Sequence, residues 1–201
     1  DDVAALQKIV IQQNSKGARL PLDLDNENGA YSWYTWDENG RLVGLNWWYK
    51  GIQGEISFEG LTELKKINCE ENRITDLSVD KNIKLESLKC WANQIKQLDV
   101  SNNSNLIELS CSSNQLEGLD TRNNKLLTTL DCGANRLTNI DVSNNKELEN
   151  LYFSNNKISE IDLSNNTKLT SVLCYNNQLG NLDLENNVNL YQLNCWNNQL
   201  D

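Results

Sequence analysis

The feature that most constrains the fold is a segment that returns at one constant interval, with copies that begin at Leu64, Leu85, Leu106, Leu127, Leu148, Leu169 and Leu190. Its pattern is L-x-x-L-x-C-x-x-N-x-L-x-x-L-D-V-S-x-N-x-x, with isoleucine or valine in place of some leucines. Seven copies agree in register, and no copy of this length can bury its apolar side chains alone. The repeat therefore predicts a solenoid, in which successive copies stack and share one continuous core.

All six cysteines occupy one slot of this repeat. They are Cys69, Cys90, Cys111, Cys132, Cys174 and Cys195, and the remaining copy has Phe153 there. Because the slot accepts phenylalanine, we interpret it as a packing position for a small apolar side chain. Disulfides are the first alternative, but parallel strands in register hold side chains parallel instead of converging. No pair has zinc-site spacing and no histidine is available to activate a thiol, so we predict six free, unreactive thiols.

The alternation of apolar and polar residues around the cysteine slot predicts a short strand in each copy. The positions expected to point inward are Leu64, Ile67, Cys69, Ile74, Leu77, Val79 and their equivalents. One column of asparagines follows the strands: Asn72, Asn93, Asn114, Asn135, Asn156, Asn177 and Asn198. A second column comprises Asn82, Asn103, Asn124, Asn145, Asn166 and Asn187. A buried amide can bond backbone groups of its own turn and of a neighbouring turn, so we interpret both columns as structural.

A column of aspartates raises the alternative of bound calcium. Its members are Asp99, Asp120, Asp141, Asp162 and Asp183. Calcium takes about six to eight oxygen ligands from flexible loops, whereas a turn aspartate can simply accept a backbone N–H. The segment DLDNENG at 23–29 is also a poor calcium loop, because its glycine falls one place late and Tyr34 occupies the twelfth position. We therefore predict no metal and no other cofactor.

Residues 1–41 do not follow the repeat and are interpreted as an N-terminal cap. Asp1 can cap a helix that ends near Gly17, with an apolar face expected to comprise Val3, Leu6, Ile9 and Val10. The segment WYTWDENGRLVGLNW predicts a β-hairpin with Asn39-Gly40 at its turn. The core of the cap is expected to contain Trp33, Trp36 and Trp47.

The repeats occupy residues 42–201, beginning with an opening repeat at 42–63 that is one residue longer than the later copies and ending with an incomplete copy. No polar cap closes the last leucine, although solenoids need one at each end. Two interpretations follow: the chain is a fragment of a longer protein, or this end meets a second chain end to end.

The segment L-x-x-L-x-C-x-x-N-x-L resembles the leucine-rich-repeat motif, and the variant with L-D-V-S-x-N is similar to repeats of bacterial surface and secreted proteins. The resemblance covers residues 42–201. It implies an α/β repeat solenoid, namely a right-handed coil with a parallel β-sheet on its concave side and an N-terminal cap of helix and hairpin. It does not imply a particular ligand, because proteins with this repeat bind many.

Composition and charge exclude several classes of function. A formal net charge of −10 repels phosphate backbones, which argues against nucleic acid, and no apolar run approaches the roughly 20 residues of a membrane span. Glu108 and Asp131 could form a glycosidase pair, but an open surface offers nothing to raise the pKa of either carboxyl. We therefore predict a non-enzymatic module that recognises a protein or glycan, extracellular or on a bacterial cell surface. A passive spacer in a longer surface protein is the alternative.

Strand alternation places the residues on either side of the cysteine on the concave face. Following these two slots through the copies shows aromatic residues on both sides of a centre of small ones. Exposed Trp and Tyr supply large contact area at small entropic cost. The predicted ligand contacts are Trp91, Tyr152, Leu173, Tyr175 and Trp196. Against this stands the simple alternative that single exposed aromatic residues are common on protein surfaces.

Overall fold

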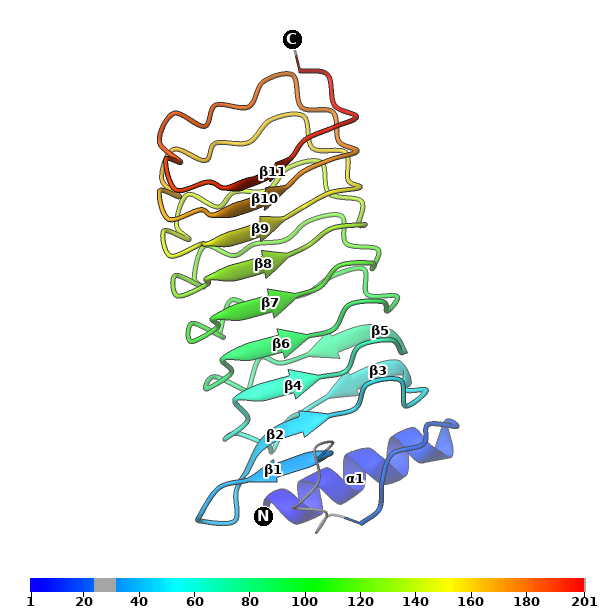
Figure 1. The fold of residues 1–201 in the computed structure, drawn as a ribbon. Helices are drawn as coiled ribbons and strands as arrows, with labels where there is room; N and C mark the ends of the chain where they lie inside the picture. The colour runs from blue at the N-terminus through cyan, green and yellow to red at the C-terminus, as the bar shows by residue number, and fades with distance from the viewer. Residues whose placement is uncertain (24–31, 201) are drawn as a thin grey trace.

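The computed structural model describes residues 1–23 and 32–200, which form a coil of about seven turns with a helix at its N-terminal end (Figure 1). One sheet of nine strands runs the length of the coil, in the order β1-β2-β4-β6-β7-β8-β9-β10-β11. Its strands are β1 (Tyr34–Trp36), β2 (Leu42–Asn46), β4 (Lys66–Asn68), β6 (Ser87–Lys89), β7 (Glu108–Ser110), β8 (Thr129–Asp131), β9 (Asn150–Tyr152), β10 (Ser171–Leu173) and β11 (Gln192–Asn194). The predicted leucine-rich-repeat coil with a parallel sheet and a helical cap is confirmed.

From β2 onward the strands are parallel and keep the register of the repeat. Ser87 of β6 pairs with Glu108 of β7, and Glu108 pairs in turn with Thr129 of β8. In the strands of this sheet from β4 to β10 the central residue, such as Leu88 or Leu109, is buried and the residues on either side of it belong to the opposite face, whereas the central Leu193 of β11 is 43% exposed. Because the step is constant, equivalent side chains form columns along the coil.

A second sheet of two parallel strands lies behind the first turns of the nine-stranded sheet (Figure 1). Its strands are β3 (Gln53–Ser57) and β5 (Arg73–Ser78). This sheet was not predicted, because buried residues in β5 recur every third position instead of alternating.

In the segment that connects the nine-stranded sheet to the two-stranded sheet, the opening turn is longer than the turn that follows it. Asn46 pairs with Asn68 in the large sheet, and Gln53 pairs with Arg73 in the small one. The path from Asn46 to Gln53 therefore contains two more residues than the path from Asn68 to Arg73. A bulge after Gly54 follows, and beyond it the pairing of β3 with β5 returns to the regular interval of the repeat.

The predicted hairpin joins the cap to the coil. β1 is antiparallel to β2, with Thr35 opposite Gly44, and the N–H of Asp37 donates to the carbonyl of Arg41 at 2.9 Å. Gly40 adopts a left-handed φ of 69° in the turn, which glycine tolerates without a steric penalty. β2 thus serves both as the second hairpin strand and as the first strand of the parallel sheet.

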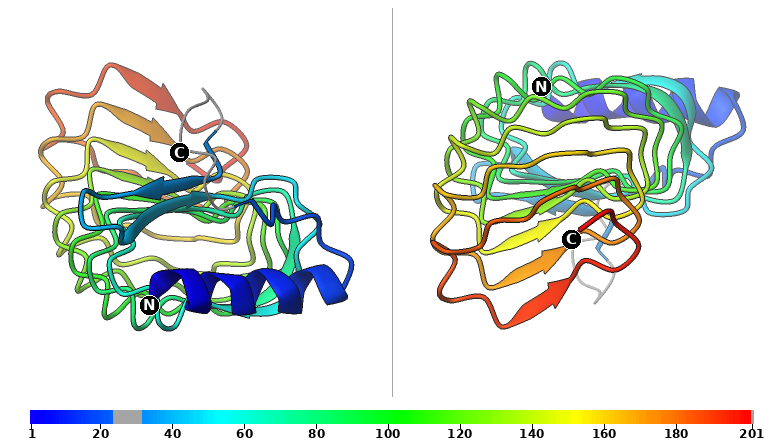
Figure 2. Two further views of the ribbon diagram at one scale, coloured as in Figure 1. Left: turned by 90° about the horizontal axis from the view of Figure 1, so that it is seen from below. Right: turned by 90° about the horizontal axis from the view of Figure 1, so that it is seen from above.

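Helix α1 (Asp2–Ser15) lies across the N-terminal end of the coil (Figures 1 and 2). Asp1 caps it by accepting the N–H of Val3 at 3.0 Å, as predicted. The expectation that Val3 belongs to the buried face is wrong, because Asp2 is the buried residue of the first turn and bonds Arg41 at 3.0 Å. Within the described residues no helix combines the length and apolar character needed to cross a bilayer.

The core contains the cysteine column as expected. All six cysteines are free, five are buried, and Cys195 in the last turn is half-buried. Burial raises the pKa of the Cys90 thiol to about 12. Trp47 is fully buried in the cap, with Trp33 and Trp36 packed partly buried against the same core.

Both asparagine columns join neighbouring turns. The side-chain amide of Asn93 donates to the carbonyls of Cys69 and Cys90, each at 3.0 Å, while its oxygen accepts the N–H of Ile74 at 2.9 Å. In the second column, the amide of Asn124 donates to the carbonyls of Val100 and Asn103, each at 2.9 Å. The structural interpretation of both columns is therefore confirmed.

The aspartate column consists of turn residues. Asp99 accepts the N–H of Ser101 at 2.9 Å, and Asp141 accepts the N–H of Ser143 at the same distance. In the part of the chain that the structure describes, no group of three or more acidic, cysteine or histidine side chains is arranged to hold a metal ion. The DLDNENG segment lies outside the described residues from position 24 onward.

Candidate functional site

The outward side of the nine-stranded sheet, which we call the sheet face, is the face that the repeat predicts to be concave. The column before the cysteine slot contains Asn46, Asn68, Lys89, Ser110, Asp131, Tyr152, Leu173 and Asn194. The column after it contains Trp48, Glu70, Trp91, Ser112, Gly133, Ser154, Tyr175 and Trp196. The constant register of the strands places the members of each column side by side.

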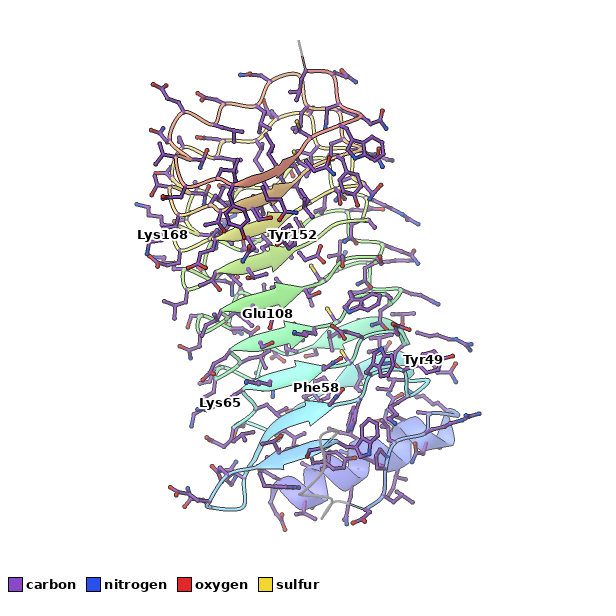
Figure 3. All side chains as sticks on the ribbon, viewed as in Figure 1. Tyr49, Phe58, Lys65, Glu108, Tyr152 and Lys168 are labelled. Atoms are coloured by element: carbon purple, nitrogen blue, oxygen red, sulfur yellow. The ribbon has the colours of Figure 1, made fainter. Side chains whose placement is uncertain are left out.

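Four of the five predicted contact residues lie together near the C-terminal end of the sheet face. Tyr152 and Leu173 are register partners on β9 and β10, and Tyr152 projects from the sheet in Figure 3. The rings of Tyr175 and Trp196 stack in parallel, with their centroids 5.2 Å apart and their planes within 1°. Trp196 is 57% exposed, and the other three side chains are half-buried. We call Tyr152, Leu173, Tyr175 and Trp196 the aromatic cluster.

Trp91 is not part of this cluster. It follows β6, and three strands, β7, β8 and β9, separate it from the strand that precedes Tyr175. Its neighbour is Glu70, whose pKa is raised by burial, while a hydrogen bond with the Trp91 side chain acts in the opposite direction. The structure therefore assigns Trp91 a different environment from the other predicted contacts.

Three small residues, Ser112, Gly133 and Ser154, separate Trp91 from the aromatic cluster in the column after the cysteine slot. A Cβ atom added to Gly133 would lie 3.2 Å from the carbonyl oxygen of Ser154, closer than ordinary packing allows. Asp131 accepts the hydroxyl of Ser112 at 2.8 Å and the N–H of Gly133 at 3.1 Å, which fixes the carboxylate against the sheet. The residues between Trp91 and the aromatic cluster are thus small and hydrogen-bonded to one another.

The two carboxylates considered for glycoside hydrolysis are both engaged. Glu108 accepts the hydroxyl of Ser87 at 2.9 Å and pairs with the ammonium of Lys89 at 2.9 Å. Figure 3 shows Glu108 on the middle of the sheet face. With Asp131 bonded to its own turn, neither carboxylate is presented as a free acid or base to a ligand.

The N-terminal end of the sheet face is polar and charged, a feature that was not predicted from the sequence. A cavity of about 390 Å³ lies over β2 and β4, and its lining includes Lys65, Lys66 and Lys89. Lys65 pairs with Glu86 at 3.5 Å and Lys89 with Glu108, so two of the three ammonium groups have carboxylate partners. The sheet face therefore changes from polar and charged at this end to aromatic at the other.

No protein-family model and no curated protein matches the chain. Among solved structures, it is similar to the functional domain of InlJ from Listeria monocytogenes, which includes a cysteine ladder, with 35% identity and a TM-score of 0.66. That alignment covers 79% of this chain and 40% of the InlJ domain in that structure. The internalin InlF of the same organism is 32% identical with a TM-score of 0.67, over 70% of this chain and 44% of InlF.

A third neighbour, internalin C2 of Listeria monocytogenes, is 22% identical with a TM-score of 0.72, over 80% of this chain and 74% of its own, and shows the fold alone. The chain spans less than half the length of InlJ and of InlF. By its 21-residue period, its parallel-strand coil and these neighbours, the chain is a leucine-rich-repeat protein.

Proposed function

We propose that the chain is a non-enzymatic recognition module that binds a protein through the sheet face, with the aromatic cluster at the centre of the contact. The observation that carries this proposal is the grouping of Tyr152, Leu173, Tyr175 and Trp196 on one outward surface. In the repeat these slots also accept serine, glycine and asparagine, so the core does not require aromatic residues there.

The physical properties of the cluster suit protein recognition. Tyrosine and tryptophan bury large areas while losing few rotamers, and they are enriched at the energetic centres of interfaces. The stacked rings of Tyr175 and Trp196 already restrict each other, so less side-chain entropy is lost on binding. The carboxylate of Asp131, the register neighbour of Tyr152, and the hydroxyl of Ser112 would supply polar contacts beside this apolar centre.

A glycan is the second candidate ligand, because an exposed ring such as that of Trp196 can stack on the apolar face of a sugar. We further propose that the module acts outside a bacterial cell or on its surface, which the similarity to Listeria internalins supports. Six thiols that are free and mostly buried are compatible with oxidising surroundings.

The test is a double substitution, Tyr152→Ser with Tyr175→Ser, compared with Tyr191→Ser. Tyr191 is 80% exposed and lies outside both sheet-face columns, so it controls for the loss of an exposed tyrosine. The immobilised wild-type protein is used to isolate host or bacterial surface proteins and to probe a glycan array. We expect the double variant to melt as the wild type does and to bind the isolated partner at least about tenfold more weakly.

The Tyr191→Ser control should keep its affinity. A partner whose affinity is the same for the wild type and the double variant would contradict the proposed contact surface. If neither a protein nor a glycan binds the wild type, the chain acts as a passive spacer and the proposal is wrong.

A further inference from the structure

The additional residues of the opening turn form one wall of a cavity at the junction between the cap and the coil. The cavity has a volume of about 540 Å³, and Lys50 and Gly51 lie on its wall together with residues from the C-terminal end of α1. We call it the cap pocket, defined by Lys16, Arg19, Lys50, Glu71 and Arg73. Tyr49, which also lines it, lies at the edge of the coil above the end of α1 in Figure 3.

The charge of the cap pocket is opposite to that of the whole chain. Four side chains of its lining are basic and one, Glu71, is acidic, whereas the chain has 18 basic and 28 acidic residues. The C-terminal end of α1 adds a partial negative charge nearby, which does not cancel the four cations. A local excess of positive charge in a concave wall concentrates anions even when the net charge is negative.

Three of these cations have no carboxylate partner among the described residues. Lys16, Arg19 and Arg73 form no ion pair there, which is also true of several other lysines and arginines of the coil, but these three line one cavity. The fourth cation, Lys50, lies over the ring of Trp33, with its ammonium 3.4 Å from the ring centroid. The cap pocket thus brings together four cations that form no ion pair with a carboxylate among the described residues.

The backbone around the cap pocket is held in place. The N–H of Arg19 donates to the carbonyl of Lys50 at 2.7 Å, which ties the cap to the opening turn. The side-chain oxygen of Asn72 accepts the N–H groups of both Lys50 and Ile52, at 3.1 and 3.0 Å. Between them, the N–H of Gly51 has no acceptor in the described part of the chain, which leaves a backbone donor in the wall of the pocket.

We propose that the cap pocket binds an anion that carries clustered phosphate or sulfate groups. Both groups are tetrahedral oxyanions, and the fork of an arginine side chain can donate two hydrogen bonds to either of them. The volume of the cavity falls within the range of small-ligand sites. This site lies at the cap, away from the aromatic cluster, so it does not depend on the function proposed for the sheet face.

The test measures binding by calorimetry with three probes: tripolyphosphate, sucrose octasulfate and citrate. The variant is Arg19→Ser with Arg73→Ser, and the matched control is Arg136→Ser with Lys157→Ser. Arg136 and Lys157 are exposed and occupy the slot of Arg73 in later turns, so the control removes the same charge from the same face of the repeat.

We expect tripolyphosphate or sucrose octasulfate to bind the wild type, with an affinity that falls as salt rises. The pocket variant should bind at least about tenfold more weakly, because each arginine loses charge-assisted hydrogen bonds. The control variant should stay within about twofold of the wild type. Binding of only one of the two probes would identify phosphate or sulfate as the natural group.

The proposal is overturned if neither oxyanion binds, if the control variant loses as much affinity as the pocket variant, or if citrate binds as tightly as both probes. The Tyr152→Ser/Tyr175→Ser variant should retain oxyanion binding, and its retention separates this site from the sheet face. Thermal melting of both charge variants checks that the fold is intact, because the side chains concerned are exposed.

Discussion

The hydroxyl of Thr121 donates a hydrogen bond of 2.9 Å to the side-chain oxygen of Asn145, which lies in the next turn of the coil. The equivalent oxygen is buried without a hydrogen-bond partner in Asn82, Asn103, Asn124, Asn166 and Asn187. The slot of Thr121 contains Val100 in the turn before and Val142 in the turn after, and neither can donate. The core thus contains a row of buried amide acceptors, of which Thr121 satisfies one.

Exchanging threonine and valine in this slot should therefore have unequal effects in neighbouring turns. Thr121→Val leaves the Asn145 oxygen unpaired and should lower the free energy of unfolding by about 1–2 kcal/mol. Val142→Thr should be close to neutral, because its hydroxyl can reach the unpaired oxygen of Asn166. Denaturant unfolding measures both changes.

Val172→Thr is the control for that experiment. Val172 is fully buried at the centre of β10. Its substitution should lower the free energy of unfolding by more than about 1 kcal/mol, because the new hydroxyl would be buried without a hydrogen-bond acceptor assigned to it. Equal losses for Val142→Thr and Val172→Thr would contradict the role assigned to the amide oxygens.

Asn93→Ala should be among the more damaging single substitutions in the coil. It removes an acceptor for the N–H of Ile74 and a donor to two buried carbonyls, so we expect a loss of about 3 kcal/mol or more. Asn102→Ala, at an exposed position, should change stability by less than about 0.5 kcal/mol. Similar melting temperatures for the two variants would be inconsistent with this account.

Ala134→Asn should stabilise the protein. Ala134 has a left-handed φ of 50°, which asparagine tolerates better than alanine. In the following turns, the side chain of Asn176 donates to that of Asn155, and Asn197 donates to Asn176 at 2.7 Å. Adding one more amide to this row should raise the free energy of unfolding by about 0.5–1 kcal/mol. Ala134→Gly relieves only the strain of the left-handed φ. The difference in the free energy of unfolding between the two variants therefore measures the side-chain hydrogen bond.

Acid should destabilise the coil through its aspartate column. Hydrogen bonds from Ser101, Ser143 and Ser164 lower the pKa values of Asp99, Asp141 and Asp162 below the usual value for aspartate. Their contribution is therefore present above the unfolded-state pKa and is lost as the pH falls through the lower folded-state pKa. The melting temperature should be steady from about pH 7 to 5 and fall below about pH 4.

The triple variant Asp99→Asn, Asp141→Asn and Asp162→Asn tests this cause of acid sensitivity. Asparagine can still accept the backbone N–H but does not titrate in this range, so the fall below about pH 4 should become shallower. An unchanged acid profile would assign the sensitivity to other carboxylates.

The thiols should be almost unreactive in the native protein. Five of six are buried, and burial raises the pKa of Cys174 to about 12, so little thiolate forms at neutral pH. A thiol reagent should titrate at most the half-buried Cys195 in the folded chain and all six cysteines after unfolding without reductant. Rapid reaction of several thiols under native conditions would show that the turns open readily.

The coil could be predicted in detail because a fixed period converts sequence positions into columns. The buried slots, the asparagine bonds and the hairpin all follow from local patterns repeated in register. The position of Val3 was missed because Asp2, a charged residue, takes the buried place through its contact with Arg41. The pairing of β3 with β5 was missed because the buried residues of β5 recur every third position instead of alternating.

The two candidate sites also differ in how far the sequence could predict them. Tyr152, Leu173, Tyr175 and Trp196 could be grouped from the alternation of the strands, while their stacking geometry required coordinates. The cap pocket could not be anticipated, because its cations come from the cap, the opening turn and β5, and only the fold brings Lys16 and Arg73 to one cavity. Charge totals for the whole chain conceal such a local excess.

The hydrogen bonds that join the turns connect residues 19, 21 or 24 positions apart, so each turn is an interchangeable unit. Deleting one whole repeat from the interior of the array, or duplicating it, would present every bonded group with an equivalent partner. The length of the coil can therefore be changed in steps of one strand spacing, about 4.8 Å. An insertion of any other length must be absorbed locally, as in the opening turn, where the two additional residues near Lys50 lie at the wall of the cap pocket.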